Sequence, residues 1–467
     1  MSGSGGAVRS LSHRIGWSFI NSMSGLVAST VTLLVVSRVV EPHAYGRVSV
    51  VIAAWGLLLT PVTWCGSLLM RFGPIEYEAS GRLHRTLRAR LHFIWLTLPL
   101  LCIGGLAYFG LALHWSHVEL ALTLAWILST SAGDPLLWAA VAAQRFAPMT
   151  LANVSLRAAP LVLLCMALVH PMTVSADMLL GANVAGSIVA VVIYLTGLRG
   201  IVGVAPLDRE LLRQMWRYAR PLLWGVPGQA AVLWLDPLLL DHWAPAADVG
   251  RYQLAYPTFT VFAALGAAVN AVLSPELVRA TAAGRPEVVT RYATQTQPWL
   301  ALAGGLAAFG GACVAPPLLH LVLPVRYAMT ADLVAILSIA GGFLLGFWSL
   351  LPLVTVTDSV AAQQVSTILQ AVINVGLDIA LAPRYGSVGV AMANVFAWAV
   401  SYASLTLFMR RSTRVPRWPI LAVSAGAVAA LAVVRADWGT PARALAASAF
   451  LLVAGLVGAR LYRTRSA

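Results

Sequence analysis

Apolar blocks of similar length recur along the whole chain, separated by short polar segments. A helix that crosses the hydrocarbon core of a bilayer needs about 20 mostly apolar residues, so the pattern predicts about fourteen membrane-spanning helices. The expected spans cover residues 15–38, 44–70, 91–113, 118–142, 150–170, 178–198, 219–241, 249–274, 297–323, 331–355, 362–383, 388–409, 418–435 and 441–461.

The distribution of positive charge predicts the orientation. An even number of spans places both termini on one side of the membrane, and every basic residue of the chain is arginine. If the N-terminus is cytoplasmic, most arginines fall in the cytoplasmic segments, as the positive-inside rule requires. We therefore expect cytoplasmic N- and C-termini, with short tails at residues 1–14 and 462–467.

The composition excludes a soluble or disordered chain. Apolar residues make up 59% and charged residues 10%, with a mean hydropathy of +0.81, whereas soluble domains are about 25% charged. The net charge of +14 would indicate a nucleic-acid partner in a soluble protein. Here the positive-inside asymmetry explains it, and no nucleic acid is expected.

Neither catalysis nor a bound cofactor is predicted. No loop is long enough to fold as a catalytic domain, and the sequence contains no HExxH, GxSxG or P-loop motif. The four cysteines, Cys65, Cys102, Cys165 and Cys313, lie in apolar runs without ligand spacing, so neither a disulfide nor a metal site is expected. We predict a non-enzyme, driven at most by a proton or sodium gradient.

A faint internal repeat predicts two similar halves. Gly46-Arg47 opens the second expected helix and Gly250-Arg251 opens the eighth, while Asn-Val pairs occur within Gly181–Gly186 and Ala391–Ala397 at a similar offset. Repeats of this kind are typical of transporters. The predicted fold is an all-α polytopic membrane protein with two pseudo-symmetric six-helix lobes: an N-lobe (15–200), a linker (201–218), a C-lobe (219–409) and two added helices (418–461).

One expected helix carries a pronounced polar stripe. Gln363, Thr367, Gln370, Asn374 and Asp378 follow one another at spacings of three or four residues and so lie on one helical face. Polar side chains in a span face protein or water rather than lipid. Five on one face favour a water-facing surface over simple packing between helices.

Two other expected helices carry shorter versions of the stripe. Gln229 and Asp236 lie on one face of the seventh helix, and Asn21 lies on a face shared with Thr32 of the first. Both packing between helices and the lining of a cavity are open interpretations for Asn21 and Gln229.

Asp134 and Arg157 are expected at nearly the same membrane depth, since they lie at similar distances along the chain from Arg145. One interpretation is an ion pair that neutralises both groups. In the other, Arg157 faces a central cavity and binds an anionic headgroup, while Asp134 orients it or exchanges protons with it.

Asp236 and Asp378 have no arginine within one turn in the sequence, which makes both candidates for coupling to a cation or proton. The alternative for Asp378 is a contact with Arg384. Three arginines lie near the outer helix ends, where they either snorkel to the interface or form a phosphate-binding vestibule. These three are Arg38, Arg47 and Arg251.

Three segments resemble a known family. LLVVSRVVEPHAYGRVSVV looks like the first two helices of polysaccharide flippases of the multidrug/oligosaccharidyl-lipid/polysaccharide (MOP) exporter superfamily. RYARPLLWGVPGQAAVLWLDPLLL followed by ADVGRYQLAY is similar to their helices 7 and 8, with Asp236 at the characteristic acidic position. INVGLDIALAPRYGSVGVAMANV resembles their helices 11 and 12.

The resemblance, to the Wzx-type O-antigen and exopolysaccharide branch in particular, implies two lobes that rock around a central cavity of the bacterial inner membrane. The implied substrate is a polyprenyl-pyrophosphate-linked oligosaccharide, and the implied partners are membrane lipids and the polysaccharide polymerase machinery. A cation-coupled multidrug exporter and a lipid-linked peptidoglycan precursor flippase are the alternatives. The expected cavity residues are Arg157, Gln363, Gln370, Asn374, Gln229 and Asn21.

Overall fold

The structure is a computed structural model. It describes residues 24, 27–28, 30–63, 66–107, 110, 115–170, 173–203, 205–357, 359–435, 446, 448–450 and 452–453. Regular secondary structure in this part of the chain is helical, and nine of its helical stretches are long and apolar enough to cross a membrane. The expected all-α polytopic membrane fold is confirmed. The helices form two compact units, Met1–Val226 and Pro227–Ala467.

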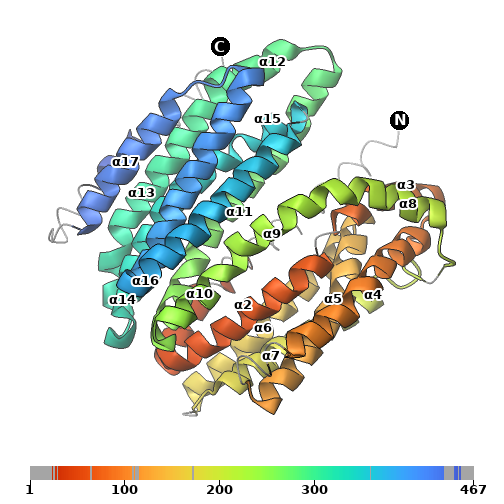
Figure 1. Cartoon of the computed structure of the whole chain (residues 1–467), viewed down its shortest axis with the longest axis horizontal. Helices are drawn as coiled ribbons and strands as arrows, with labels where there is room; N and C mark the ends of the chain where they lie inside the picture. The colour runs from red at the N-terminus through yellow and green to blue at the C-terminus, as the bar shows by residue number, and fades with distance from the viewer. Residues whose placement is uncertain are drawn as a thin grey trace, which may run out of the picture. The chain divides into compact units, whose positions relative to one another are not determined.

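The N-terminal unit is built from long, apolar helices (Figure 1, red to yellow-green). Within it α5 and α7 pack against each other, and α6 packs along α7. Its elements are a short helix at Thr30–Val39, α2 (Pro42–Thr63), α3 (Ser67–Ser80), α4 (His84–Ala107), α5 (His117–Ala142), α6 (Phe146–Val169), α7 (Ala176–Gly197), α8 (Arg209–Ala219) and the 3-10 turn η2 (Arg220–Gly225).

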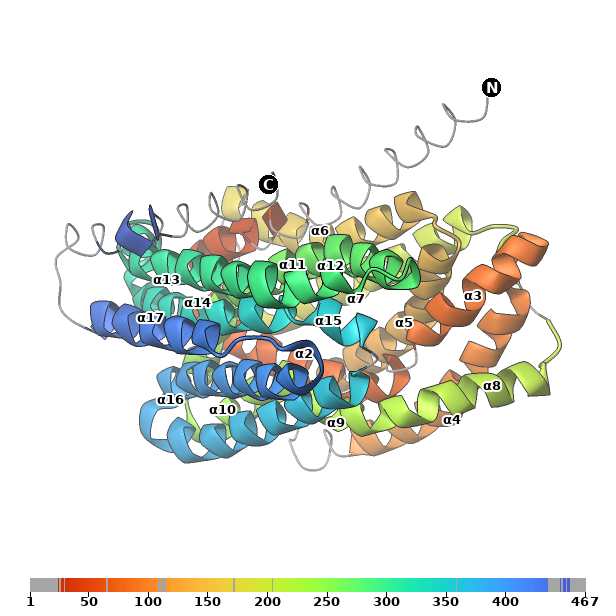
Figure 2. The same cartoon turned by 90° about the horizontal axis from the view of Figure 1, so that it is seen from above.

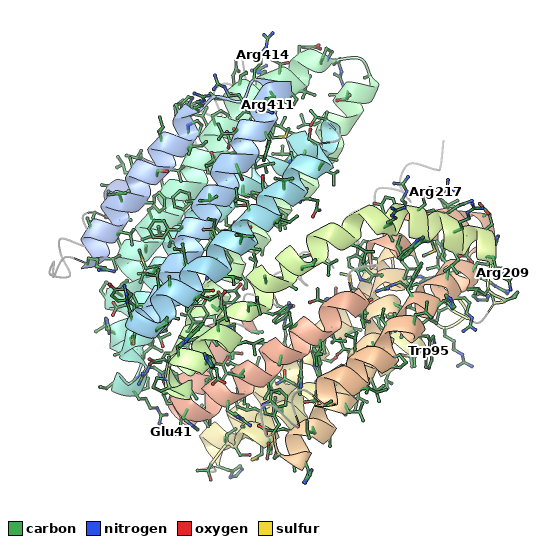
Figure 3. The ribbon with its side chains drawn as sticks, viewed as in Figure 1. Glu41, Trp95, Arg209, Arg217, Arg411 and Arg414 are labelled. Carbon is green, nitrogen blue, oxygen red and sulfur yellow. The ribbon has the colours of Figure 1, made fainter. Side chains whose placement is uncertain are left out.

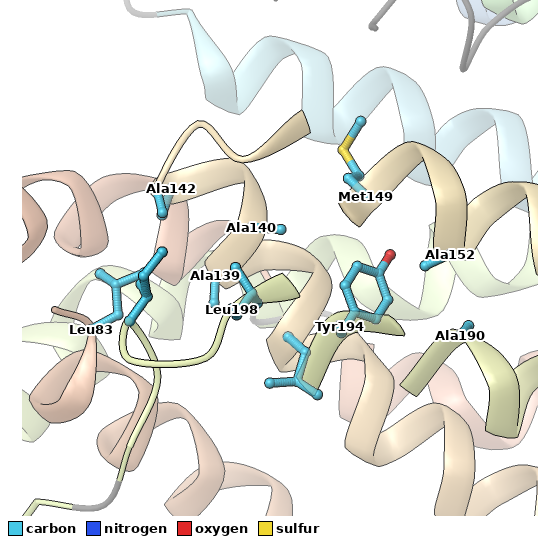
Figure 4. Packing of buried hydrophobic residues seen from close by; sticks show 12 residues of the cluster. Leu83, Ala139, Ala140, Ala142, Met149, Ala152, Ala190, Tyr194 and Leu198 are labelled. Atoms are coloured by element: carbon cyan, nitrogen blue, oxygen red, sulfur yellow. The ribbon is translucent and has the colours of Figure 1, made fainter. Parts of the chain in front are cut away.

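Small side chains allow the helices of this unit to approach closely. Ala139 and Ala140 of α5, Ala152 of α6 and Ala190 of α7 are all buried in one cluster, with Tyr194 filling the space between them (Figure 4). Because lipid provides little hydrophobic driving force, helices in a membrane associate mainly through such close van der Waals packing.

The C-terminal unit surrounds one buried helix, α14, which packs against α11, α13, α16 and α17 (Figure 2). The sequence of α14 is apolar on all faces, as expected of a helix covered on all sides. The elements of the unit are α9 (Val226–Ala230), η3 (Ala231–Leu235), α10 (Asp236–Trp243), α11 (Ala246–Ala282), α12 (Pro286–Arg291), η4 (Tyr292–Thr296), α13 (Gln297–Val322), η5 (Val325–Tyr327), α14 (Ala328–Trp348), α15 (Leu351–Val356), α16 (Val360–Thr413) and α17 (Trp418–Arg435).

The nine apolar stretches and the fourteen expected spans differ for identifiable reasons. Half of the expected first helix and most of the helix at 441–461 lie outside the described residues, as do both tails. The expected helices at 362–383 and 388–409 are both present, as the two arms of α16 on either side of Gly386, and count as one of the nine stretches. The expected helix at 219–241 is divided into four shorter elements, η2, α9, η3 and α10. The 37-residue α11, which covers the expected helix at 249–274, is not one of the nine apolar stretches.

Two boundaries in the N-terminal unit differ from the sequence prediction. The expected helix at 44–70 is broken near Gly66, where α2 ends and α3 begins. Residues 71–90, which lie between two expected spans, are helical for most of their length, because α3 extends to Ser80 and α4 already begins at His84. The expected linker at 201–218 likewise contains most of α8, an amphipathic helix. Hydropathy recognises spans, but not helices with a polar face.

Candidate functional site

A buried carboxylate, Asp236, is the centre of a polar cluster in the C-terminal unit. It opens α10 directly after the π-helical turn η3, a local distortion common at functional sites. Its side chain is 2% exposed. Tyr252 Oη donates to Asp236 Oδ2 at 2.6 Å, Asn394 Nδ2 donates to the same oxygen at 2.7 Å, and Asn374 Nδ2 donates to Oδ1 at 2.7 Å. The side chain is thus held by α11 and by α16 at two positions.

A second carboxylate, Asp378, shares one of these donors. Asn374 Nδ2 lies 3.1 Å from Asp378 Oδ2, so one amide group bridges the two carboxylates. Asp378 and Asn374 are both buried. Their other side-chain oxygens, Asp378 Oδ1 and Asn374 Oδ1, are buried without a hydrogen-bond partner in the described part of the chain. Buried polar atoms are normally paired, so these two are available to a further group.

The kink in α16 makes this cluster possible. Asn374 and Asn394 are twenty residues apart in sequence, which corresponds to about 30 Å along a straight helix. Both nevertheless contact the carboxylate of Asp236. Between them Gly386 has φ 54° and ψ −136°, a conformation that is open to glycine and strained for other residues. The reversal at Gly386 therefore brings both arms of α16 to one side chain.

The charges of the cluster are acidic. Among the ion pairs of the described residues, none involves Asp236 or Asp378. Two carboxylates this close repel each other strongly in a low-dielectric interior unless a positive charge lies between them. The described residues form no group of three or more His, Cys, Asp or Glu side chains suited to a metal ion. Two carboxylates with amide oxygens suit a proton or a monovalent cation.

The polar stripe of residues 363–378 is divided in two by the fold. Gln363 and Thr367 are half-buried, but Gln370, Asn374 and Asp378 are buried. The expectation of a water-facing surface is therefore wrong for the last three, because they are buried inside the C-terminal unit. Gln229 is exposed on α9, and Asn21 lies outside the described residues.

An ion pair between Asp134 and Arg157, one of the two interpretations left open by the sequence, is wrong. The partner of Asp134 is Arg90 of α4, whose Nη2 lies 2.9 Å from Asp134 Oδ2. Arg90 is 1% exposed, and Trp138 Nε1 also donates to Asp134 at 3.1 Å. Arg157 lies at the surface of α6, where its Nη1 is 3.4 Å from Ser24 Oγ. Arg90 lies in the second turn of α4, which begins at His84, seven residues before the span expected from hydropathy.

Protein groups accept hydrogen bonds from Arg47 and Arg251 of the expected vestibule. Arg47 makes a two-fold contact with Glu119, at 2.8 and 2.9 Å. Arg251 donates to Asp248 at 2.7 Å and to the carbonyl of Arg326 at 3.1 Å. The carboxylate of Glu119 satisfies Arg47, which weakens its case as a phosphate ligand. Arg38 is exposed.

Sequence reasoning missed Asn394 and Tyr252 as members of the Asp236 cluster. Asn394 was visible only as part of the internal repeat, in which it matches Asn183. In the structure Asn183 donates to the carbonyl one turn earlier, that of Leu179, at 2.8 Å, whereas Asn394 also contacts Asp236 and Tyr252. The internal repeat therefore identified Asn394 as a position of interest. Its contact with Asp236 is what distinguishes it from Asn183.

The chain matches no family model and no curated protein. Its fold is nevertheless found in solved structures. It is similar to an inward closed structure of the lipid II flippase MurJ, with a TM-score of 0.68 and 12% identity, covering 96% of this chain and 98% of that one. It is also similar to an inward-facing multidrug resistance MATE family transporter of the MOP superfamily, with a TM-score of 0.60, 13% identity and coverages of 91% and 100%.

The eukaryotic MATE transporter AtDTX14 matches with a TM-score of 0.52, 15% identity and coverages of 91% and 98%. At these identities the similarity establishes the fold alone. The chain thus has the fold of flippases and transporters of the MOP superfamily. These neighbours are transporters rather than enzymes, which fits the expectation from the sequence.

Proposed function

We propose that the protein carries a polyprenyl-pyrophosphate-linked oligosaccharide, the repeat unit of an O-antigen or exopolysaccharide, from the cytoplasmic to the outer leaflet of the bacterial inner membrane. Transport proceeds by alternating access and is coupled to a proton or sodium ion at Asp236 and Asp378. The observation that carries the proposal is the buried pair of carboxylates bridged by Asn374. The fold shared with a lipid II flippase supports it.

Coupling follows from the helices that meet at the carboxylates. Asp236 belongs to α10, Tyr252 to α11, and Asn374 and Asn394 to the two arms of α16. A bound cation offsets the repulsion between the acids and draws these helices together. When the ion leaves, the same helices lose that attraction. Ion occupancy therefore favours one packing of the C-terminal unit over another, which is how a ligand drives a conformational equilibrium.

The substrate needs polar contacts for its pyrophosphate and sugars, which cannot cross hydrocarbon unaided. Arg157 is the proposed anion contact, because it lies within the apolar helix α6 and presents its guanidinium at the surface. Gln363 and Gln229 are the proposed hydrogen-bonding partners of the sugars, since neither is buried. Gln370 and Asn374, which are buried, are assigned to the ion site instead.

The test is a translocation assay in vesicles of purified protein with a fluorescent polyprenyl-pyrophosphate oligosaccharide. Cleavage of the sugar by an external, membrane-impermeant oxidant reports its transfer to the outer leaflet. We expect transfer with wild-type protein, and an acceleration when an inward sodium or proton gradient is imposed. Asp236→Asn is expected to abolish the acceleration. The matched control is Asp177→Asn, at an exposed position of α7.

Two outcomes would overturn the two parts of the proposal separately. No transfer of the sugar lipid by folded wild-type protein would refute the substrate. Transfer whose rate does not depend on either ion, or whose ion dependence survives in Asp236→Asn, would refute the role of the carboxylates.

Two alternatives rest on specific observations. A cation-coupled multidrug exporter is favoured by the same acidic cluster and by the MATE neighbours. A lipid-linked peptidoglycan precursor flippase is favoured by the MurJ match. Parallel assays with a fluorescent organic cation and with a lipid-linked disaccharide-pentapeptide distinguish them, because each alternative requires its own substrate to move faster than the sugar lipid.

A further inference from the structure

Helix α8 of the N-terminal unit carries a row of arginines on one face. Arg209, Arg213, Arg217 and Arg220, which is the C-cap of the helix, follow one another at spacings of four, four and three residues. At 3.6 residues per turn, these spacings confine the four side chains to an arc of about 80° and spread them over about 16 Å of helix length. All four are exposed, and Figure 3 shows Arg209 and Arg217 on the outer side of the unit.

The opposite face of α8 is fixed to the rest of the unit. Met215 and Ala219 are buried in a cluster with Leu68 of α3 and Ala89 of α4. Tyr218 lies between Phe72, in an edge-to-face contact of 6.2 Å, and the guanidinium of Arg71, 4.3 Å from its ring centre. The arginine face is therefore presented by a rigid support and not by a mobile loop.

The arginine row has no acidic partner in the described part of the chain. Its members are absent from the four ion pairs. Of the two nearby acids, Asp208 is paired with Arg85, and Glu210 of the first turn accepts a hydrogen bond from Gln214 at 3.2 Å. Four exposed arginines on one face outnumber the acid of the helix and repel one another, so anions lying against the row would offset that repulsion.

An aromatic residue beside the row indicates that this face of α8 lies at the membrane boundary. Trp216 directly precedes Arg217 in the sequence, so it lies beside the arginine row on the helix. It stacks on Phe93 at 6.0 Å, yet is 45% exposed. Tryptophan is enriched at the boundary between headgroups and hydrocarbon, and an amphipathic helix with a basic polar face lies in that boundary.

We propose that α8 is a binding surface for anionic phospholipids, whose headgroup phosphates lie along Arg209, Arg213, Arg217 and Arg220. Arginine binds phosphate through two parallel hydrogen bonds. A row of about 16 Å accommodates several separate phosphates, whereas the pyrophosphate of a single carrier lipid would engage only part of it. This surface requires no particular transport substrate and is independent of the function proposed above.

The test uses the full protein in nanodiscs of phosphatidylcholine with a minor fraction of phosphatidylglycerol. A photo-crosslinking amino acid at Gln214, an exposed position of α8 next to Arg213, captures adjacent lipid for mass spectrometry. We expect phosphatidylglycerol to be captured well above its mole fraction. Each arginine near an anionic surface contributes about 1 kcal/mol, so R213Q/R217Q should lower the enrichment by roughly tenfold or more.

Two double variants serve as controls. R145Q/R285Q removes the same charge from two exposed positions outside α8 and is expected to leave the enrichment unchanged. R213K/R217K keeps the charge and is expected to retain most of it, which separates loss of binding from loss of folding. Capture of both lipids in proportion to their mole fractions would overturn the proposal. An equal loss of enrichment in R145Q/R285Q would also overturn it, because net charge alone would then explain the preference.

Discussion

Arg90 and Asp134 form an ion pair of 2.9 Å inside the N-terminal unit, with both side chains buried. Arg90 Nη2 also donates to the carbonyl oxygen of Val62, in the last turn of α2. The carbonyls in the last turn of a helix lack partners within that helix. Arg90 therefore supplies a hydrogen-bond donor to a carbonyl group that has no partner where α2 ends. Asp134 balances the charge of Arg90.

Removing one partner of this pair is expected to be strongly destabilising. Asp134→Leu leaves the Arg90 guanidinium buried without a counter-ion, which costs about 3–5 kcal/mol. Thermal unfolding of the detergent-solubilised protein, followed by size-exclusion chromatography, measures the loss. Asp177→Leu, at an exposed site of α7, is the control and should have little effect. The double variant Arg90→Leu/Asp134→Leu should recover part of the stability; additive losses from the two single changes would refute a coupled pair.

Gly66 is expected to tolerate no side chain. A Cβ atom at this position would lie 2.0 Å from Nε1 of Trp138, the atom that donates to Asp134. Gly66→Ala must displace the indole and break that hydrogen bond, at a cost of about 1–3 kcal/mol from overpacking. Gly104→Ala, in α4 with no atom within 4 Å of its Cβ, should be neutral or slightly stabilising. Equal melting temperatures for the two variants would contradict this packing.

The kink of α16 depends on glycine. Gly386→Ala places a Cβ on a backbone with φ 54° and ψ −136°, which costs about 1–3 kcal/mol. Gly376→Ala, in the preceding arm of the same helix, meets no atom within 4 Å and should stabilise the helix slightly. We also expect Gly386→Ala, but not Gly376→Ala, to weaken the sodium or proton dependence of transport, because the kink brings Asn374 and Asn394 to Asp236. If Gly386→Ala leaves the ion dependence of transport unchanged, the kink is not required for ion binding at Asp236.

The N-terminus of α8 is expected to loosen at acidic pH. The carboxylate of Asp208 pairs with Arg85 and accepts the backbone N–H groups of Leu211 and Glu210, which lowers the pKa of Asp208. Its stabilising effect is fully present above the ordinary aspartate pKa of about 3.9 and is lost as the pH falls through the lowered value.

Hydrogen-exchange protection of α8, corrected for intrinsic rates, checks this expectation. Protection of the first turn should decrease below about pH 4, and Asp208→Asn should remove that decrease. A decrease of equal size in Asp208→Asn would assign the effect to another acid.

The sequence by itself determined the class of the protein and the positions of its chemistry. Apolar blocks of about 20 residues are longer than a helix in a globular core and predict membrane spans. Carboxylates such as Asp236 and Asp378 stand out within these spans because an ionised group is costly in the bilayer. Spacing along a helix also identified the common face of Gln370, Asn374 and Asp378. These are local properties, since each depends on the residue and its few neighbours in the chain.

Only the tertiary structure decided which groups meet. Hydropathy gives the depth of Asp134 but not the neighbour it faces, so it offered Arg157 as one possible partner, whereas the fold pairs Asp134 with Arg90. Likewise, the periodicity that aligned Asn374 with Asp378 contains no information on the reversal at Gly386 that adds Asn394. Helix breaks and rotations are set by packing between segments far apart in the chain, and one local pattern is compatible with many such packings.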